Sequence, residues 1–133
     1  MTLRYMIDTD VTSHLMRSRD QRLAQKVTRH ADQVCISSVT LGELYYGAGL
    51  TERCSHHLAQ IDDLKAVMPV LDFDAEAAAN YGDIRAHLKR AGTPIGALDP
   101  MIAAHARSRG LVLVTAKLRH FGVVEGLRLE TWL

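Results

Sequence analysis

Short runs of apolar, β-type residues alternate along the chain with longer stretches whose apolar residues recur at helical spacing. Strands are predicted at Tyr5–Ile7, Val34–Ile36, Val70–Leu71 and Leu111–Val114, and a last edge strand is expected around Leu127 and Leu129. The runs are continuously apolar instead of alternating with polar residues, which indicates strands buried on both faces of a parallel sheet.

Helices are predicted between these strands, over residues 10–17, 20–31, 39–49, 55–67, 75–91 and 100–109. In the longest of them Tyr81, Ile84 and Leu88 keep helical spacing, and Gly92 follows as a stop signal. Strands that alternate with helices predict an α/β/α sandwich with a mainly parallel central sheet. In such folds, functional sites form beyond the carboxyl ends of the strands, where the strand order reverses.

Composition places the chain among globular proteins. Its 133 residues fit one domain covering residues 1–133, and 47% hydrophobic with 23% charged residues exclude a disordered tail. The formal net charge of +1 gives no argument for or against a nucleic-acid partner. Aromatic residues make up only 5%, which argues against a base-stacking platform.

The sequence also bears on location. Its uncharged stretches are too short for a membrane span of about 20 residues, so no membrane association is expected. No secretory signal is visible at the N-terminus. Two cysteines cannot build a disulfide framework, and Cys35 in its apolar run is typical of a small buried residue. We therefore expect a cytoplasmic protein.

Four carboxylates lie where this architecture would place a site. Asp8 follows the first strand, Asp10 comes two residues later, Glu43 lies one turn into the helix after the second strand, and Asp99 opens the last long helix. Acids gathered from remote positions suit hard cations such as Mg²⁺ or Mn²⁺, which also offset their mutual repulsion. No glycine-rich phosphate loop follows the first strand, and no Ser-His-Asp or Cys-His set is apparent.

Each acid also has a purely structural interpretation. Asp8, Thr9 or Asp10 could cap the first helix. The segment from Thr40 to Glu43 matches a capping box, in which Glu43 would satisfy a backbone N–H. Asp99 followed by Pro100 is a good helix start by itself. Capping does not exclude metal binding, because a helix start at the sheet edge can serve both purposes.

Four segments together resemble a known family. They are MIDTD at 6–10, ISSVTLGELYYGA at 36–48, GTPIGALDPMIAAHA at 92–106, and LVT at 113–115 with Phe121 and GLRLETW at 126–132. Their order and spacing are similar to those of the PIN-domain ribonucleases, and more narrowly to the VapC toxins of bacterial type II toxin–antitoxin modules. Any one segment is a weak signal, whereas four in register are specific.

The resemblance implies an α/β/α PIN fold and RNA cleavage that depends on Mg²⁺, with Mn²⁺ as a substitute. Asp8, Glu43 and Asp99 match three acidic metal-site positions of the family and are the expected catalytic residues. Thr115 matches the Thr or Ser beside that site, and Asp10 stands where a supporting Asn or Asp is frequent. The resemblance further implies a VapB-like antitoxin, a homodimer, higher-order toxin–antitoxin complexes, and structured RNA as substrate, initiator tRNA cut in its anticodon loop among the possibilities.

The chain departs from the family pattern after Thr115. The run Ala116–Phe121 contains no carboxylate or amide, so the fourth acidic position is absent or replaced by Lys117 or His120. A lysine there would weaken a second metal site by repelling the cation. The favoured interpretation is a one-metal site, with Lys117 or Arg119 on RNA phosphate. The alternative is a catalytically impaired PIN module that binds antitoxin or RNA without cleaving it.

Several other residues have two interpretations. Arg85 is a candidate for RNA contact, although its helix face can equally be a solvated one. His105 is expected to be a packed histidine satisfied by the backbone, and a proton-shuttle role for His120 is the weaker possibility. Met16 with Leu44 and Tyr45 indicates core or a partner groove. Trp132 is expected to pack the last strand. A DNA exonuclease or flap-type nuclease is less favoured, because the chain has no room for DNA-gripping elements.

Overall fold

The computed structural model describes residues 2–133 and confirms the predicted sandwich. The helices are α1 (Thr9–Arg17), α2 (Gln21–Arg29), α3 (Ser38–Gly49), α4 (Cys54–Val67), α5 (Ala75–Ala91), α6 (Asp99–Ser108) and α7 (Leu118–Phe121), with a 3₁₀ turn η1 at Ala31–Gln33. The strands are β1 (Tyr5–Ile7), β2 (Val34–Ser37), β3 (Val70–Leu71), β4 (Val112–Val114) and β5 (Leu129–Glu130).

The five strands form one sheet in the order β3-β2-β1-β4-β5, and every pair is parallel. The chain moves outward from β1 to β3 on one side, then crosses back to β4 and β5 on the other. The strand order therefore reverses between β1 and β4, which places the expected site beyond the carboxyl ends of these two strands.

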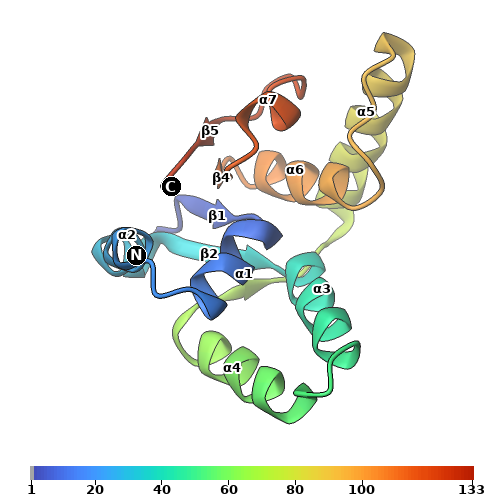
Figure 1. Cartoon of the computed structure of the whole chain (residues 1–133). Helices are drawn as coiled ribbons and strands as arrows, with labels where there is room; N and C mark the ends of the chain where they lie inside the picture. Colours follow the sequence, from blue (N-terminus) through green and yellow to red (C-terminus); the bar gives the residue numbers. More distant parts are fainter. Residues whose placement is uncertain (1) are drawn as a thin grey trace.

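Successive residues of the central strands face opposite layers of helices. Tyr5 and Ile7 pack with α1 to α4, whereas Met6 packs with α5, α6 and α7. Figure 1 shows α4 on one side of the strands and α5 with α6 on the other. Since both faces are covered, burial of a large apolar side chain contributes on the order of 1.5–3 kcal/mol on either side of the sheet.

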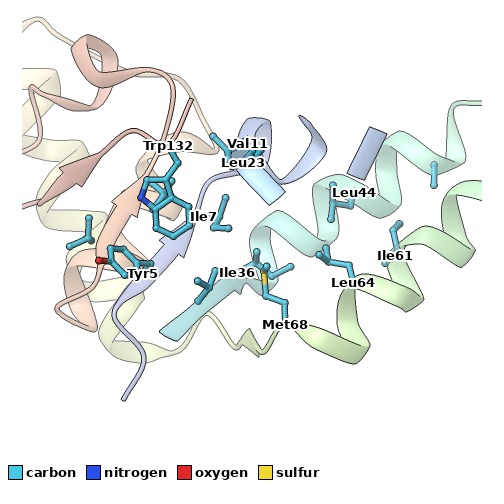
Figure 2. Close-up of a cluster of buried hydrophobic side chains, with 14 residues drawn as sticks. Tyr5, Ile7, Val11, Leu23, Ile36, Leu44, Ile61, Leu64, Met68 and Trp132 are labelled. Carbon is cyan, nitrogen blue, oxygen red and sulfur yellow. The ribbon is translucent and has the colours of Figure 1, made fainter. Parts of the chain in front are cut away.

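The hydrophobic core on the side of α1 to α4 contains residues from near both ends of the chain. Trp132 lies beside Tyr5 and Ile7, while Leu44 and Leu64 fill the space between α3 and α4 (Figure 2). Trp132 is buried: its ring contacts Tyr5 of β1 at a centroid distance of 5.0 Å, and its Nε1 donates to the Glu130 carboxylate of β5, the last strand, at 3.0 Å.

Most differences from the predicted elements are small. Leu111 and Leu127 lie outside the strands predicted to contain them, and the short helix α7 was not predicted. Four residues are too few for helical periodicity to show in a sequence. Within residues 2–133, no helix is both long enough and apolar enough to cross a membrane.

Candidate active site at the carboxyl edge of the sheet

Asp8 lies at the point where the strand order reverses. Its backbone N–H donates to the carbonyl of Val114 at 3.0 Å, which continues the pairing of β1 with β4. Its Oδ1 accepts from the N–H of Val11 at 2.9 Å, and its Oδ2 accepts from the Thr115 hydroxyl at 2.6 Å. The capping interpretation of Asp8 is therefore confirmed, and it leaves the second oxygen facing the end of β4.

Residue Asp8 is only 2% exposed, and this burial has an electrostatic consequence. Burial raises its pKa above the usual 3.8, and the nearby Asp10 adds to the shift. The hydrogen bonds from Thr115 and Val11 and the charge of Lys117 oppose it without cancelling it. The ionised form of Asp8 is thus destabilised, and a cation at this edge of the sheet would relieve that cost.

Glu43 reaches the same edge from α3. Its Oε1 accepts from the Thr9 hydroxyl at 2.7 Å, and Thr9 lies 3.0 Å from the hydroxyl of Thr40. The capping-box prediction for Thr40 and Glu43 is wrong, because α3 begins at Ser38 and is capped by the Ser37 side chain. Thr9 was not singled out as a site residue, although its position next to Asp8 was the available signal.

The Asp99 carboxylate contacts two side chains, His120 of α7 and Lys117, the residue that precedes α7. Its Oδ2 accepts from Lys117 Nζ at 2.9 Å and lies 2.8 Å from His120 Nε2. The structural interpretation of Asp99 as a helix cap is wrong by one position: Leu98 precedes the helix, and Asp99 makes no side-chain cap. The carboxylate is therefore available for interactions across the site.

Asp10 and Asp99 share the same ammonium group. Lys117 Nζ lies 3.2 Å from Asp10 Oδ2 as well as 2.9 Å from Asp99, and the Lys117 backbone N–H donates to the Thr115 hydroxyl at 2.9 Å. Through Thr115, this cluster is continuous with Asp8. The sequence placed these residues near one another but did not reveal this direct ion pairing.

The donor set suits a hard divalent cation, although its side chains are not gathered around one point. Across residues 2–133, no three His, Cys, Asp or Glu side chains form a group that could hold a metal ion as they stand. In that part of the chain, Glu43 Oε2 and Asp99 Oδ1 accept no hydrogen bond. Carboxylate oxygens are the ligands that Mg²⁺ and Mn²⁺ prefer, so these residues fit such an ion.

The other residues considered from the sequence are Arg119, Arg85 and His105. Arg119 is exposed on α7, two residues after the ion-paired Lys117. Arg85 is exposed on α5, where its guanidinium donates to the Tyr81 hydroxyl at 2.7 Å. His105 is buried as expected, but its partner is the Ser37 hydroxyl at 2.8 Å instead of the backbone, and its Nε2 has no partner among the described residues.

A groove runs beside Glu43 between α1, α3 and α4. Met16 and Leu44 line it together with Gly47, Gln60 and Ile61. Leu44 is also part of the core, so both interpretations of that residue hold. Tyr45 is partly exposed and accepts a hydrogen bond from Lys65.

Comparison with known proteins identifies the family to which this architecture belongs. The PIN domain model matches residues 5–123. The chain is 43% identical to the tRNA(fMet)-specific endonuclease VapC of Shigella flexneri and 40% identical to the ribonuclease VapC2 of Haemophilus influenzae, each over 130 residues that cover 98% of both partners. In the crystal structure of DNA-bound VapBC from Salmonella typhimurium, a chain 40% identical to this one superposes with a TM-score of 0.96, covering 98% of this chain and 99% of that one. The chain therefore belongs to the PIN-domain family and, within it, to the VapC ribonucleases.

Proposed function

We propose that this VapC ribonuclease is the toxin of a toxin–antitoxin pair and that it cleaves initiator tRNA in the anticodon loop in a reaction dependent on Mg²⁺ or Mn²⁺. The observation that supports this proposal is the position of Asp8, which is buried where the strand order reverses and accepts a hydrogen bond from Thr115. Glu43 is bonded to the adjacent Thr9, and Asp99 is linked to Thr115 through Lys117. The substrate is inferred from the Shigella flexneri relative, which is named for tRNA(fMet). Cleaving that tRNA would stop translation in the cytoplasm.

Asp8, Glu43 and Asp99 would hold the cation through carboxylate oxygens. A bound Mg²⁺ supplies a coordinated water of lowered pKa and offsets charge on the phosphodiester. The chain's own contribution is positioning: Thr115 fixes one oxygen of Asp8, Thr9 fixes one oxygen of Glu43, and Lys117 with His120 fixes one oxygen of Asp99. Asp10 supports the site through its ion pair with Lys117.

Three basic residues, Arg119, Arg85 and Lys117, are the candidates for binding the RNA backbone. Arg119 is exposed on α7, the helix whose His120 contacts Asp99, and Arg85 is exposed on α5. Lys117 is engaged by Asp10 and Asp99 and is the weaker phosphate-binding candidate of the three. A cationic rim around an acidic site would hold the phosphates while the carboxylates serve the chemistry.

Antitoxin binding and self-association belong to the same proposal. A VapB-like antitoxin segment would lie in the groove of α1, α3 and α4, whose position beside Glu43 lets it cover the site. The exposed Tyr46 on α3 and Leu50 directly after it supply apolar surface for a homodimer and for larger toxin–antitoxin complexes. Multi-angle light scattering of the toxin with and without its antitoxin tests both assemblies.

Purified toxin freed of antitoxin tests the activity directly. Incubated with initiator tRNA and Mg²⁺ or Mn²⁺, it should yield two fragments on a denaturing gel, and an elongator tRNA should stay intact. Chelation of the metal or the change Asp8→Asn should abolish the product. Cleavage that persists in either case would overturn the metal role, and equal cleavage of both tRNAs would overturn the substrate.

The competing hypothesis is a PIN module that binds RNA or antitoxin without cutting. One observation favours it: the Lys117 ammonium lies between two carboxylates of the site. Absence of product at every Mn²⁺ concentration, with tRNA binding intact by gel shift, would support this alternative.

A further inference from the structure

Lys117 is built into the acidic edge of the sheet as an internal cation. Its ammonium contacts Asp10 of α1 at 3.2 Å and Asp99 of α6 at 2.9 Å, two residues from opposite layers of the sandwich. The same group lies 5.5 Å from the centre of the Phe121 ring. Three elements therefore fix the ammonium, and it is not a freely moving surface lysine.

The backbone also sets this position. The Lys117 N–H donates to the Thr115 hydroxyl, which in turn donates to Asp8. A single hydrogen bond thus links the Lys117 backbone to the Thr115 hydroxyl, which orients the most buried carboxylate, that of Asp8. A change in the position of Lys117 would therefore be transmitted to Asp8 through the Thr115 side chain.

The charges around Lys117 favour its protonated form. Burial lowers its pKa, but the hydrogen bonds and charges of Asp99 and Asp10 outweigh burial and raise the pKa above 10.5. The ammonium is therefore present throughout the neutral range. It neutralises part of the negative charge at the edge of the sheet where Asp8 and Glu43 also lie.

We propose that Lys117 is the resident counter-ion of this site: it occupies Asp10 and one oxygen of Asp99 in place of a second divalent cation and lowers the affinity of the remaining carboxylates for the first. This inference rests on the proposed metal-dependent function. Asp8, Glu43 and the unoccupied oxygen of Asp99 remain for a single divalent ion. Because like charges repel, the ammonium makes that ion bind more weakly than the four carboxylates alone would allow.

Isothermal calorimetry with Mn²⁺ on the full-length, antitoxin-free protein tests the inference. The wild type should bind one Mn²⁺. Lys117→Met, which keeps the length of the side chain and removes its charge, should bind the first Mn²⁺ on the order of tenfold more tightly. Lys117→Arg should stay close to the wild type, because the charge is retained.

Lys89→Met is the matched control, since it removes one positive charge from an exposed position on α5. Its Mn²⁺ affinity should equal that of the wild type, and circular dichroism should show all variants folded. Equal affinity of Lys117→Met and wild type would overturn the inference while leaving the metal site intact, as would an equal gain in Lys89→Met or two Mn²⁺ ions on the wild type. Failure of every variant to bind Mn²⁺ would overturn the proposed metal dependence as well.

Discussion

At the scale of single residues, Asp8 serves the fold and the site with different oxygens. Oδ1 caps α1 through Val11, and Oδ2 accepts from Thr115 at the end of a distant strand. The cap alone would need only an acceptor, which Asn also provides. The negative charge is therefore a cost to the fold, and the proposed metal-binding role of Asp8 gives a reason for it.

This division predicts that Asp8→Asn stabilises the protein while abolishing RNA cleavage. The pKa of Asp8 is raised in the folded state. The folded protein therefore keeps its full stability below the unfolded value near 3.8, where the carboxyl is protonated in both states, and loses stability as pH rises through the folded pKa. At pH 7 in chelator, the variant should melt a few degrees above the wild type. The difference should shrink at pH 4, as measured by calorimetry. A lower melting temperature for the variant at pH 7 would contradict this reasoning.

His105 predicts the opposite dependence on pH. Burial lowers its pKa below 6.5, and Arg109 adds to the shift, whereas Asp74 and Asp72 oppose it. A depressed histidine pKa gives stability that is fully present above the unfolded pKa and is lost as pH falls from there through the folded pKa. Urea unfolding should show the wild type losing more stability between pH 7.5 and 5.5 than His105→Gln. Parallel losses in the two proteins would argue against the buried neutral imidazole.

At the scale of elements, α5 contains one glycine and is followed by another, and their backbone conformations differ. Gly82 lies inside the helix with open space around it, whereas Gly92 ends the helix at a φ of +73°. The backbone N–H of Gly92 donates to the carbonyl oxygen of Lys89, and the N–H of Thr93 donates to the carbonyl oxygen of Leu88, so the turn depends on this left-handed conformation.

Alanine at these two positions should therefore act in opposite directions. Gly82→Ala should stabilise the protein by up to about 1 kcal/mol, because alanine is the better helix former. Gly92→Ala should destabilise it by about 1–2 kcal/mol, because a Cβ is strained at positive φ. Urea denaturation of both variants gives the comparison. The same sign for both changes would show that the helix end does not depend on the glycine.

The sequence predicted most elements but not the contacts between their side chains. Continuous apolar runs identify β1, β2 and β4, because a strand covered on both faces needs apolar residues at every position. The four-residue α7 is too short for periodicity to detect. Capping patterns at Glu43 and Asp99 were misleading, because their actual partners, Thr9 and Lys117, are remote in sequence or on another element. Distant pairings of this kind are set by the packing of the layers.

At the scale of the whole molecule, Trp132 joins the end of the chain to its beginning. Its ring contacts Tyr5 on β1 and stacks on His30 at 5.2 Å, and only 4% of its surface is exposed. Trp132→Ala should cost about 3–5 kcal/mol in urea unfolding followed by far-ultraviolet circular dichroism. Leu133→Ala, at the exposed neighbouring position, should change stability by no more than about 0.5 kcal/mol. Similar losses for both would point to the length of the tail instead of the indole.

The position of β1 in the centre of the sheet affects when the enzyme becomes active during synthesis. Asp8 is bonded to Thr115, 107 residues later, so its partner strand emerges from the ribosome only after most of the polypeptide has been made. Pairings this distant in sequence form late, since the loop must close before the contact can stabilise it. A nascent VapC ribonuclease consequently lacks the Asp8–Thr115 contact of its candidate site until the polypeptide up to Thr115 has been made.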